Sequence, residues 1–208
     1  MKSRPYHHGD LRRALINAAI ALVEEIGPDG FTLREEARRA RVSHTAPYRH
    51  FHDKNDLLAA VAEQGFTDLR AAMAKATGRA RTPLESLQRC GAAYVAFALE
   101  RTAHFRVMFG SRLDTCRQPL ARTAAELAFA ELMAVVAACQ QADVLPRGDT
   151  CGKARLAWSL VHGIAHLAIG RQLPLKAPEE ITSFVATATN SLIDGLRKDK
   201  TQRAVKQR

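Results

Sequence analysis

Long apolar runs are missing from this sequence, and their absence bears on membranes. No stretch of the 208-residue chain approaches the ~18–20 consecutive apolar residues that a transmembrane helix needs. The N-terminus is polar and has no apolar segment of the kind that a signal peptide carries. We therefore expect a cytoplasmic protein that has no membrane partner.

Cysteine is scarce, and its spacing argues against stabilisation by disulfides. The four cysteines are far apart and include no CxxC pair: Cys90, Cys116, Cys139 and Cys151. This pattern favours free thiols in a reducing compartment over a disulfide framework or a zinc ribbon. One alternative is a redox sensor at Cys116, because the neighbouring Arg112 and Arg117 would favour its thiolate.

The sequence signatures of common enzymes are also missing. The chain contains no GxSxG nucleophile turn, no Walker loop for phosphates and no HExxH zinc motif. It also has no pair of carboxylates placed for acid/base catalysis. We therefore expect neither enzymatic activity nor a cofactor.

β-strand patterns are absent, whereas apolar residues recur at helical spacing along the whole chain. The first stripe consists of Leu11, Leu15, Ala18, Leu22 and Ile26, and Gly27-Pro28 ends it. Similar stripes lie near residues 84–98, 156–167 and 181–196. The sequence therefore predicts an all-α fold of about nine helices without a sheet.

Two helix starts are written into the sequence as capping boxes. Thr32 and Glu35 form one box, and Thr82 and Glu85 form the other, which also has Pro83 in the first helical position. In such a box the side chains of the first and fourth residues satisfy backbone N–H groups that a helix start leaves unbonded.

A pair of short helices near the N-terminus predicts the domain organisation. The sequence predicts helices over 32–40 and 43–51, separated by only two residues and preceded by a longer helix. Such a tight pair is a helix-turn-helix unit. We predict a small headpiece over 1–55, a larger helical domain over 56–198, and a basic, disordered tail over 199–208.

The charge of the chain favours a polyanionic partner, most simply nucleic acid. The net charge is +10 and the pI is near 10.0. The headpiece carries only a small part of it, since residues 1–54 contain 10 Lys and Arg against 7 Asp and Glu. Charge therefore permits DNA binding without locating it.

The second short helix is rich in hydrogen-bond donors. We predict that Ser43 caps its start and presents free N–H groups to a phosphate. The groups that suit phosphates and base edges come from a set of neighbouring side chains: His44, Thr45, Tyr48, Arg49, His50 and Lys54. The alternative from composition alone is an ordinary solvated surface helix.

The stretch from Phe31 to Leu58 resembles the N-terminal signature of the TetR family of transcriptional regulators, with an AcrR-like helix-turn-helix. The matching segments are Thr32-Leu33-Arg34, Val42-Ser43, Tyr48-Arg49-His50-Phe51 and Lys54-Asn55-Asp56-Leu57-Leu58. The resemblance implies phosphate contacts from Thr32, Tyr48, His50 and Lys54. It implies contacts with base edges from Arg34, His44, Thr45 and Ala46, with Arg49 able to make either.

Two residues depart from the pattern of that family. Arg41 stands in the turn where the family most often has glycine, and a residue other than glycine costs about 1 kcal/mol in a left-handed conformation. Glu36 stands where the family usually has an aliphatic core residue. If Glu36 is buried, we expect it to pair with Arg12, Arg13 or Arg39.

The chain resembles one TetR subgroup in two places, one in the larger domain and one at the N-terminus. These are Trp158-Ser159-Leu160-Val161-His162-Gly163 and the opening Tyr6-His7-His8-Gly9-Asp10-Leu11. We predict an apolar effector pocket with few polar groups, lined by Phe97, Phe105, Met108, Phe109, Phe129, Trp158 and His162. The alternative is that these residues are simply core.

The spacing of His162 and His166 would let both imidazoles reach one metal ion. No third and fourth ligand is evident, and His104 is only a guess, so we predict no metal site. A polar pocket or a core histidine explains the pair more simply.

The function expected from these observations is transcription regulation by a ligand-responsive repressor. Two helices near 149–171 and 178–198 are expected to form a homodimer, as the resemblance implies. A dimer of this kind binds double-stranded DNA at a palindromic operator and is released by a small-molecule effector. The alternatives are a DNA-binding architectural protein without an effector and a metal or redox sensor.

Overall fold

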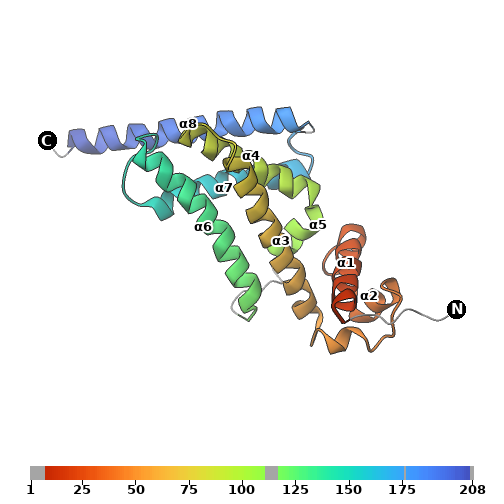
Figure 1. The fold of residues 1–208 in the computed structure, drawn as a ribbon. Coiled ribbons are helices and arrows are strands. Elements are labelled where there is room, and N and C mark those ends of the chain that lie inside the picture. The colour runs from red at the N-terminus through yellow and green to blue at the C-terminus, as the bar shows by residue number, and fades with distance from the viewer. Residues whose placement is uncertain (1–7, 111–116, 176, 207–208) are drawn as a thin grey trace. The chain divides into compact units, whose positions relative to one another are not determined.

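The computed structural model describes residues 8–110, 117–175 and 177–206, and the regular secondary structure in these ranges consists of helices alone. Its elements are α1 (His8–Ile26), α2 (Leu33–Arg39), the 3-10 turn η1 (Pro47–Arg49), α3 (Lys54–Thr77), α4 (Pro83–Glu100), α5 (Thr102–Met108), α6 (Pro119–Gln141), α7 (Thr150–Ile169) and α8 (Pro178–Lys206). Figure 1 labels the α-helices. The absence of strands from these ranges and the eight α-helices confirm the predicted all-α fold of about nine helices.

The helices pack into two units. Unit 1 consists of the chain up to residue 67 together with 101–125, and unit 2 consists of 68–100 together with the chain from 126 onwards. Helices α3 and α6 each begin in unit 1 and end in unit 2. Unit 1 is therefore larger than the headpiece expected over 1–55, because α5 and the first part of α3 pack with the N-terminal helices. The division into DNA-binding and effector domains stays a prediction.

The core of unit 1 forms where α1 packs against α2 and α5. The apolar stripe of α1 supplies Leu15, Ala18 and Leu22, and Phe51 and Phe105 join them in the buried set. Removing such apolar surface from water stabilises the unit by about 25 cal/mol per Å². Burial on the α1 stripe thus fixes the surface on which the helix-turn-helix rests.

The first residues of α2 form the capping box that the sequence predicts. The Glu35 backbone N–H donates to Thr32 Oγ1 at 3.3 Å, and the Thr32 backbone N–H donates to Glu35 Oε2 at 2.7 Å. The hydrogen bond from the Thr32 backbone is the main reason that the pKa of Glu35 lies below its usual range. This cap sets the position at which α2 begins.

Helix α2 is also tied to α1 at the surface. Both terminal nitrogens of Arg39 donate to the Glu25 carboxylate, at 2.7 and 2.5 Å. The hydrogen bonds from Arg39 lower the pKa of Glu25. Two parallel bonds between a guanidinium and a carboxylate fix orientation as well as distance, so the pair sets how α2 lies on α1.

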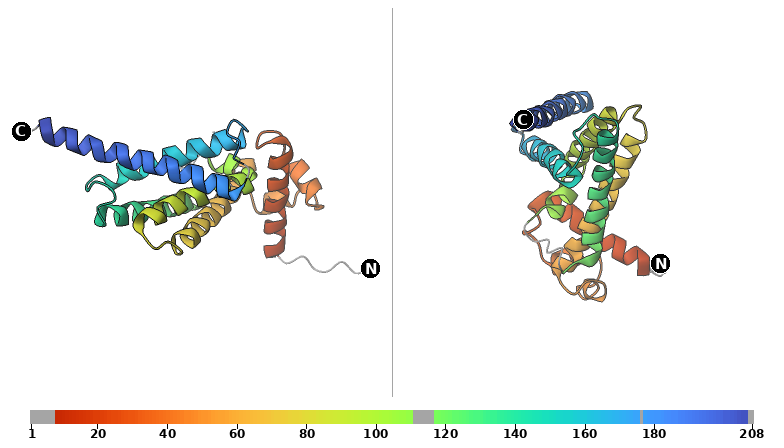
Figure 2. Two further views of the ribbon diagram at one scale, coloured as in Figure 1. Left: turned by 90° about the horizontal axis from the view of Figure 1, so that it is seen from above. Right: turned by 90° about the vertical axis from the view of Figure 1, so that its left-hand side faces the viewer.

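In unit 2, α4 packs against both α7 and α8. Helices α7 and α8 also contact each other, and in the left view of Figure 2 they cross at an angle. Gly91 on α4 makes this packing possible, because a Cβ there would lie 2.9 Å from Val185 Cγ1 and 3.1 Å from Val161 Cγ1. A larger residue at this position would push the three helices apart.

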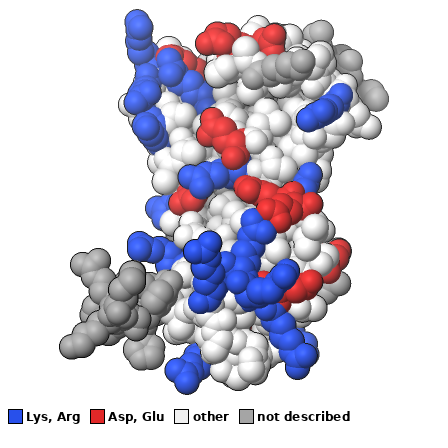
Figure 3. All heavy atoms as spheres, turned by 90° about the vertical axis from the view of Figure 1, so that its right-hand side faces the viewer, with Lys and Arg blue, Asp and Glu red and all other residues white. Residues whose placement is uncertain are grey.

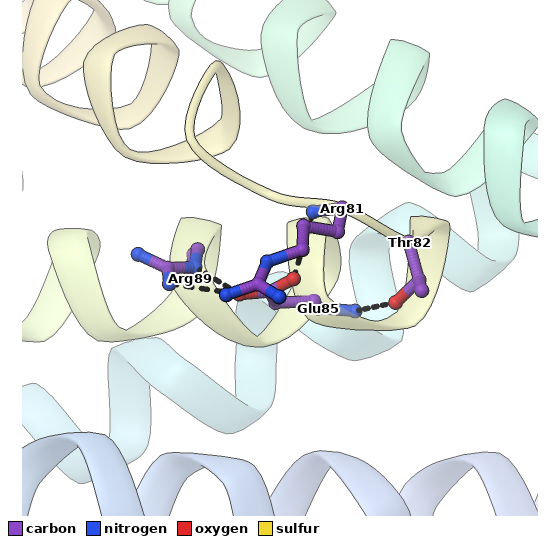
Figure 4. Close-up of polar contacts among 4 residues, drawn as sticks. All are labelled: Arg81, Thr82, Glu85 and Arg89. Carbon is purple, nitrogen blue, oxygen red and sulfur yellow. Dashed lines mark hydrogen bonds and ion pairs between the residues drawn. The ribbon is translucent and has the colours of Figure 1, made fainter.

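The start of α4 is held by the second predicted capping box, in a modified form (Figure 4). The Glu85 N–H donates to Thr82 Oγ1 at 3.1 Å, while the Glu85 carboxylate accepts from the backbone N–H of Arg81 at 2.7 Å. Glu85 also accepts from Arg89 Nε at 2.8 Å, one helical turn later. The backbone hydrogen bond from Arg81 is the largest cause of the lowered pKa of Glu85.

Helix α8 continues to Lys206, past the point at which the sequence predicts a disordered tail from residue 199. The segment from 199 to 206 contains no glycine or proline, so no residue in it forces the helix to end. Residues 207 and 208 lie outside the described residues.

Among the described helices, none has the combination of length and apolar composition required of a membrane span.

Candidate DNA-binding surface and effector site

The headpiece of unit 1 exposes most of the side chains predicted to contact DNA. These are Thr32, Arg34, Ser43, His44, Thr45, Tyr48 and Arg49. Tyr48 is the clearest case, because 55% of this large aromatic residue is exposed. A phenol left in solvent keeps its hydroxyl free to approach a phosphate oxygen.

The second short helix differs from its prediction. Only Pro47–Arg49 is helical, as a 3-10 turn, and Ser43 is not its cap because Ala46 precedes the turn. Pro47 has no N–H, so the first α-helical hydrogen bond to the Ser43 carbonyl cannot form. That carbonyl instead accepts from the Ala46 N–H at 2.9 Å, and Ser43 Oγ lies 3.1 Å from Thr45 Oγ1.

Two predicted DNA contacts are less available than the sequence suggests. Ala46 is only 7% exposed, so its methyl group belongs to the headpiece core and is not presented for a base edge. Thr32 lies at the surface, but its hydroxyl and backbone N–H both donate to Glu35 Oε2, at 2.9 and 2.7 Å. A phosphate contact from Thr32 would have to compete with this cap. His50 is half-buried.

Lys54 has an internal role that the sequence did not indicate. Its ammonium donates to the Phe31 carbonyl at 2.6 Å and to the Asp29 carbonyl at 3.3 Å, and it lies 4.2 Å from the centroid of the Phe31 ring. Burial lowers the pKa of Lys54. The side chain therefore joins the first turn of α3 to the loop before α2, and leaves one donor for a phosphate.

The expectation that a buried Glu36 pairs with an arginine is wrong. Glu36 is 0% exposed, yet neither carboxylate oxygen has a hydrogen-bond partner. Arg39, one of the expected partners, binds Glu25 instead. Burial raises the pKa of Glu36 to about 8, so the side chain is mainly protonated and uncharged at neutral pH.

Arg41 takes the left-handed conformation that its place in the turn predicts. Its φ is 56°, where glycine carries no penalty and other residues do. The backbone of the turn is retained, with the Val42 N–H donating to the Ala37 carbonyl at 3.0 Å. The substitution of the usual glycine thus costs free energy without changing the path of the chain.

Basic residues are numerous on the surface of unit 1. The exposed arginines between residues 12 and 49 are Arg12, Arg13, Arg34, Arg38, Arg39, Arg41 and Arg49. The lower half of the face drawn in Figure 3 carries a group of Lys and Arg side chains, with Asp and Glu side chains among them. A surface rich in arginine attracts a polyanion such as DNA. The acidic side chains among the arginines repel a polyanion where they are exposed.

In unit 2, a chain of polar contacts runs through an aromatic cluster on α4 and α7. Trp158 Nε1 donates to Tyr94 Oη at 3.1 Å, and Tyr94 Oη lies 2.7 Å from His162 Nδ1. His162 Nε2 in turn lies 3.1 Å from His166 Nε2. Phe129 packs edge-on against Trp158, with the ring centroids 6.1 Å apart. Four rings from two helices are thereby held in fixed orientations, with a fifth from α6 beside them.

The electrostatics of this cluster follow from its burial. Desolvation raises the pKa of Tyr94, so its hydroxyl stays protonated. Desolvation also lowers the pKa of His162, and the nearby His166 lowers it further. The cluster is therefore uncharged at neutral pH around His162, and it offers hydrogen bonds from neutral groups next to aromatic surface.

The structure brings together only part of the predicted effector set. Phe129, Trp158 and His162 form the cluster, and Phe97 is buried in the same unit. Phe105, Met108 and Phe109 belong to unit 1 instead. There Phe109 packs edge-on against Phe66, with the centroids 5.5 Å apart. Phe105 and Met108 are buried in the core of unit 1, and Phe109 is half-buried beside Phe105.

Tyr94 and His166 are the members of the cluster that were not predicted as site residues. Tyr94 lies on the apolar stripe of α4, and nothing in that stripe distinguishes a tyrosine that only packs from one that is hydrogen-bonded to a histidine on α7. The available signal was its hydroxyl, because a buried tyrosine usually finds a hydrogen-bond partner.

A face of α7 and α8 is left uncovered within the chain. Leu156 and Leu167 on α7 and Phe184 on α8 are large apolar residues that remain at least 41% exposed. Gly163 and Gly195 lie on the same helices, and a Cβ on either would meet no atom within 4 Å. Glycine inside a helix costs about 1 kcal/mol relative to alanine, and no contact with the part of the chain that the structure describes requires it at these two positions.

The described cysteines give no support to the redox alternative. Cys90 and Cys139 are buried, and burial raises their pKa values to about 12 and about 11. Reactive cysteines need the opposite shift. Cys116, on which that alternative mainly rested, lies outside the described residues.

Two segments of the chain match known protein families. Residues 15–61 match the family described as bacterial regulatory proteins, tetR family, and residues 87–191 match the tetracyclin repressor-like C-terminal domain. The chain therefore belongs to the TetR family, and it is a helix-turn-helix DNA-binding regulator of transcription.

Individual relatives agree with this assignment. The class A tetracycline repressor from transposon 1721 of Escherichia coli is 47% identical over 49 residues, which are 24% of this chain and 23% of that protein. A protein of unknown function from Rhodococcus sp. RHA1 is 34% identical with a TM-score of 0.80, over 93% of this chain and 99% of its own. FadR from Bacillus subtilis, solved with stearoyl-CoA, shares the fold at 15% identity and a TM-score of 0.72, over 88% and 98%.

Proposed function

We propose that this regulator is a homodimeric, cytoplasmic repressor without enzymatic activity. In this proposal it binds a palindromic operator through unit 1 and is released by a small-molecule effector that contacts Trp158 and His162. The single observation that carries the proposal is the polar aromatic cluster of Tyr94, Trp158 and His162, which lies in unit 2, while the exposed residues predicted to contact DNA lie in unit 1.

The chemistry of the cluster suits a small organic ligand. Effector sites are mainly apolar and contain a few polar groups that fix the orientation of the ligand. Phe129 and Trp158 offer the aromatic surface, and His162 offers a neutral imidazole. That FadR from Bacillus subtilis was solved with stearoyl-CoA supports ligand binding in a protein of this fold.

The uncovered face of α7 and α8 supports the dimer. A second copy would cover Leu167 and Phe184, and Gly163 and Gly195 would let the helices of the two copies approach closely. A two-fold dimer places two identical headpieces on the DNA, and an operator with two related half-sites follows from that symmetry.

A second candidate function is DNA binding without an effector, favoured by the net charge of +10. A thermal-shift screen against small organic molecules separates the two, because a ligand that binds the folded state raises the melting temperature by mass action. A ligand that raises it and also releases DNA supports the repressor.

Replacing Arg34 by alanine should reduce the sequence preference of the headpiece. Arg34 is exposed on α2, and we propose that its guanidinium contacts a base edge. Its loss should weaken operator binding by about 1–3 kcal/mol and relax the preference at one base pair of each half-site. Fluorescence anisotropy with operator and random DNA measures both effects.

The matched control is Arg38→Ala, which removes another exposed arginine of the same helix. It should weaken binding to operator and random DNA by similar factors. Equal losses on both DNAs for Arg34→Ala would assign Arg34 to the phosphate backbone instead.

Effector binding should change the fluorescence of Trp158, which is the only tryptophan of the chain. Emission should shift or fall over the concentrations at which an effector releases the operator. Operator DNA should weaken effector binding by the factor by which the effector weakens DNA binding, typically 5–150-fold. Equilibrium titrations of effector in the presence of operator DNA, and of operator DNA in the presence of effector, measure the two factors.

His162→Gln should weaken effector binding and leave DNA binding without effector nearly unchanged. Circular dichroism checks that the variant is folded. If the folded variant binds the effector as tightly as the natural chain, the effector site lies elsewhere.

A further inference from the structure

His162 and His166 lie one helical turn apart on α7, and their imidazoles face each other. The two Nε2 atoms are 3.1 Å apart, and the ring centroids are 4.6 Å apart. His166 is exposed, so the space beside this nitrogen pair is open to solvent on one side. His166 also projects about 100° around the helix from Leu167, which places it beside His162 and away from the leucines of the uncovered face.

The orientation of the His162 ring is set from its other nitrogen. Nδ1 lies 2.7 Å from Tyr94 Oη, and Tyr94 is itself held by the N–H of Trp158. When Nδ1 carries the hydrogen and donates to Tyr94, the lone pair of Nε2 points toward His166. Histidines that bind metals are oriented in this way, with the second ring nitrogen hydrogen-bonded to a neighbouring group.

The separation of the two nitrogens suits a shared metal ion. A metal bound at about 2.0–2.1 Å from each nitrogen would subtend an angle of about 98° between them, which lies between the octahedral and tetrahedral values. Histidines at i and i+4 on one helix face are also the spacing by which HExxH helices bind zinc. The same 3.1 Å gap otherwise holds a single proton in a hydrogen bond between the rings.

We propose that His162 and His166 bind a divalent transition-metal ion through their Nε2 atoms, with imidazole-preferring ions such as Cu²⁺, Ni²⁺ and Zn²⁺ as the class. No cluster of three or more His, Cys, Asp and Glu suited to a metal occurs among the described residues. Of the residues that the structure describes, two therefore bind the ion in this proposal, and water or a bound small molecule completes the coordination.

His162 also belongs to the proposed effector site. The inference rests on the proposed function only in that it adds a metal ion to the ligands of that site. Binding of the ion itself is a property of unit 2 and needs no DNA. The two ideas can therefore fail separately.

The test uses the full chain with His7 and His8 both replaced by glutamine, because these adjacent histidines would also attract metal ions. Calorimetric titration with Zn²⁺ and Cu²⁺, without DNA, should show one site per chain. His166→Gln and His162→Gln should each weaken it by about tenfold or more. The matched control is His52→Gln, another exposed histidine, which should leave binding unchanged.

Electron paramagnetic resonance of the Cu²⁺ form should show two nitrogen ligands, reduced to one in His166→Gln. Unchanged affinity and an unchanged spectrum in the His166 variant would overturn the inference. Operator binding by the metal-free chain tests the proposed function independently. A chain that binds operator but no metal ion overturns the metal site and leaves the repressor standing.

Discussion

Replacing Leu167 and Phe184 together by glutamate should convert the chain to a monomer and sharply weaken operator binding. Both side chains are more than 40% exposed within one chain, so the substitutions should cost the monomer little. In the proposed dimer four glutamates, two from each copy, would be buried without partners, each at a cost of several kcal/mol. Each 1.4 kcal/mol is a tenfold loss of affinity, so dimerisation should weaken by at least about a thousandfold. Light scattering measures the mass.

Leu127→Glu is the matched control for this experiment. Leu127 is 45% exposed on α6, which contributes no residue to the α7 and α8 face, and its substitution should leave the mass and the DNA affinity unchanged. A double variant that remains a stable dimer would show that the two copies meet through another surface.

Replacing Glu36 by leucine should stabilise unit 1. At neutral pH the protonated carboxyl is buried without a hydrogen-bond partner, and such a polar group costs about 1–3 kcal/mol. Leucine removes this cost and has an aliphatic shape, as expected for a core position. The free energy of unfolding, measured by urea titration of the helical signal, should rise accordingly.

The same variant should change how stability depends on pH. The unfolded carboxyl titrates near 4.5, whereas its folded pKa is about 8, so the folded chain keeps a proton that the unfolded chain loses between these values. The contribution of Glu36 to stability therefore falls as the pH rises from 4.5 to 8, by at most ~1.4 kcal/mol per pH unit, and then levels off.

Glu36→Gln serves as the control, because it keeps the size and polarity of the side chain but cannot titrate. Both variants should lose this part of the pH dependence, and only leucine should add stability at pH 6. If the natural chain and Glu36→Gln show the same dependence on pH, Glu36 is not buried as a free acid.

Within the headpiece, two features with local signals were predicted correctly from the sequence. The capping box involves only Thr32 and Glu35, three positions apart, and it occurs as expected. The left-handed conformation of Arg41 depends on its place in a short turn, and it also occurs as expected. The missing partner of Glu36 was not predictable, because it depends on where arginines from α1 lie in space. Lys54 likewise reaches carbonyls more than twenty residues away.

For the effector site the sequence provided residue types but not their grouping. Trp158 and His162 share a helix face through their spacing of four, and they do lie together. Phe105 on α5 and Phe109 just after it are the same residue type as Phe129, yet they pack in the other unit. Periodicity identifies the buried face of a helix, whereas the partner of that face depends on the packing of the whole chain.

The short 3-10 turn at Pro47–Arg49 has a consequence for exchange of backbone hydrogens with solvent. Few main-chain bonds hold the segment from Ser43 to Arg49, whereas α1 has a regular ladder beside a buried core. Amides that need only a local opening exchange long before those that need unfolding of the unit. Deuterium should therefore enter at His44, Thr45 and Tyr48 much sooner than in the middle of α1, and operator DNA should slow its entry there most.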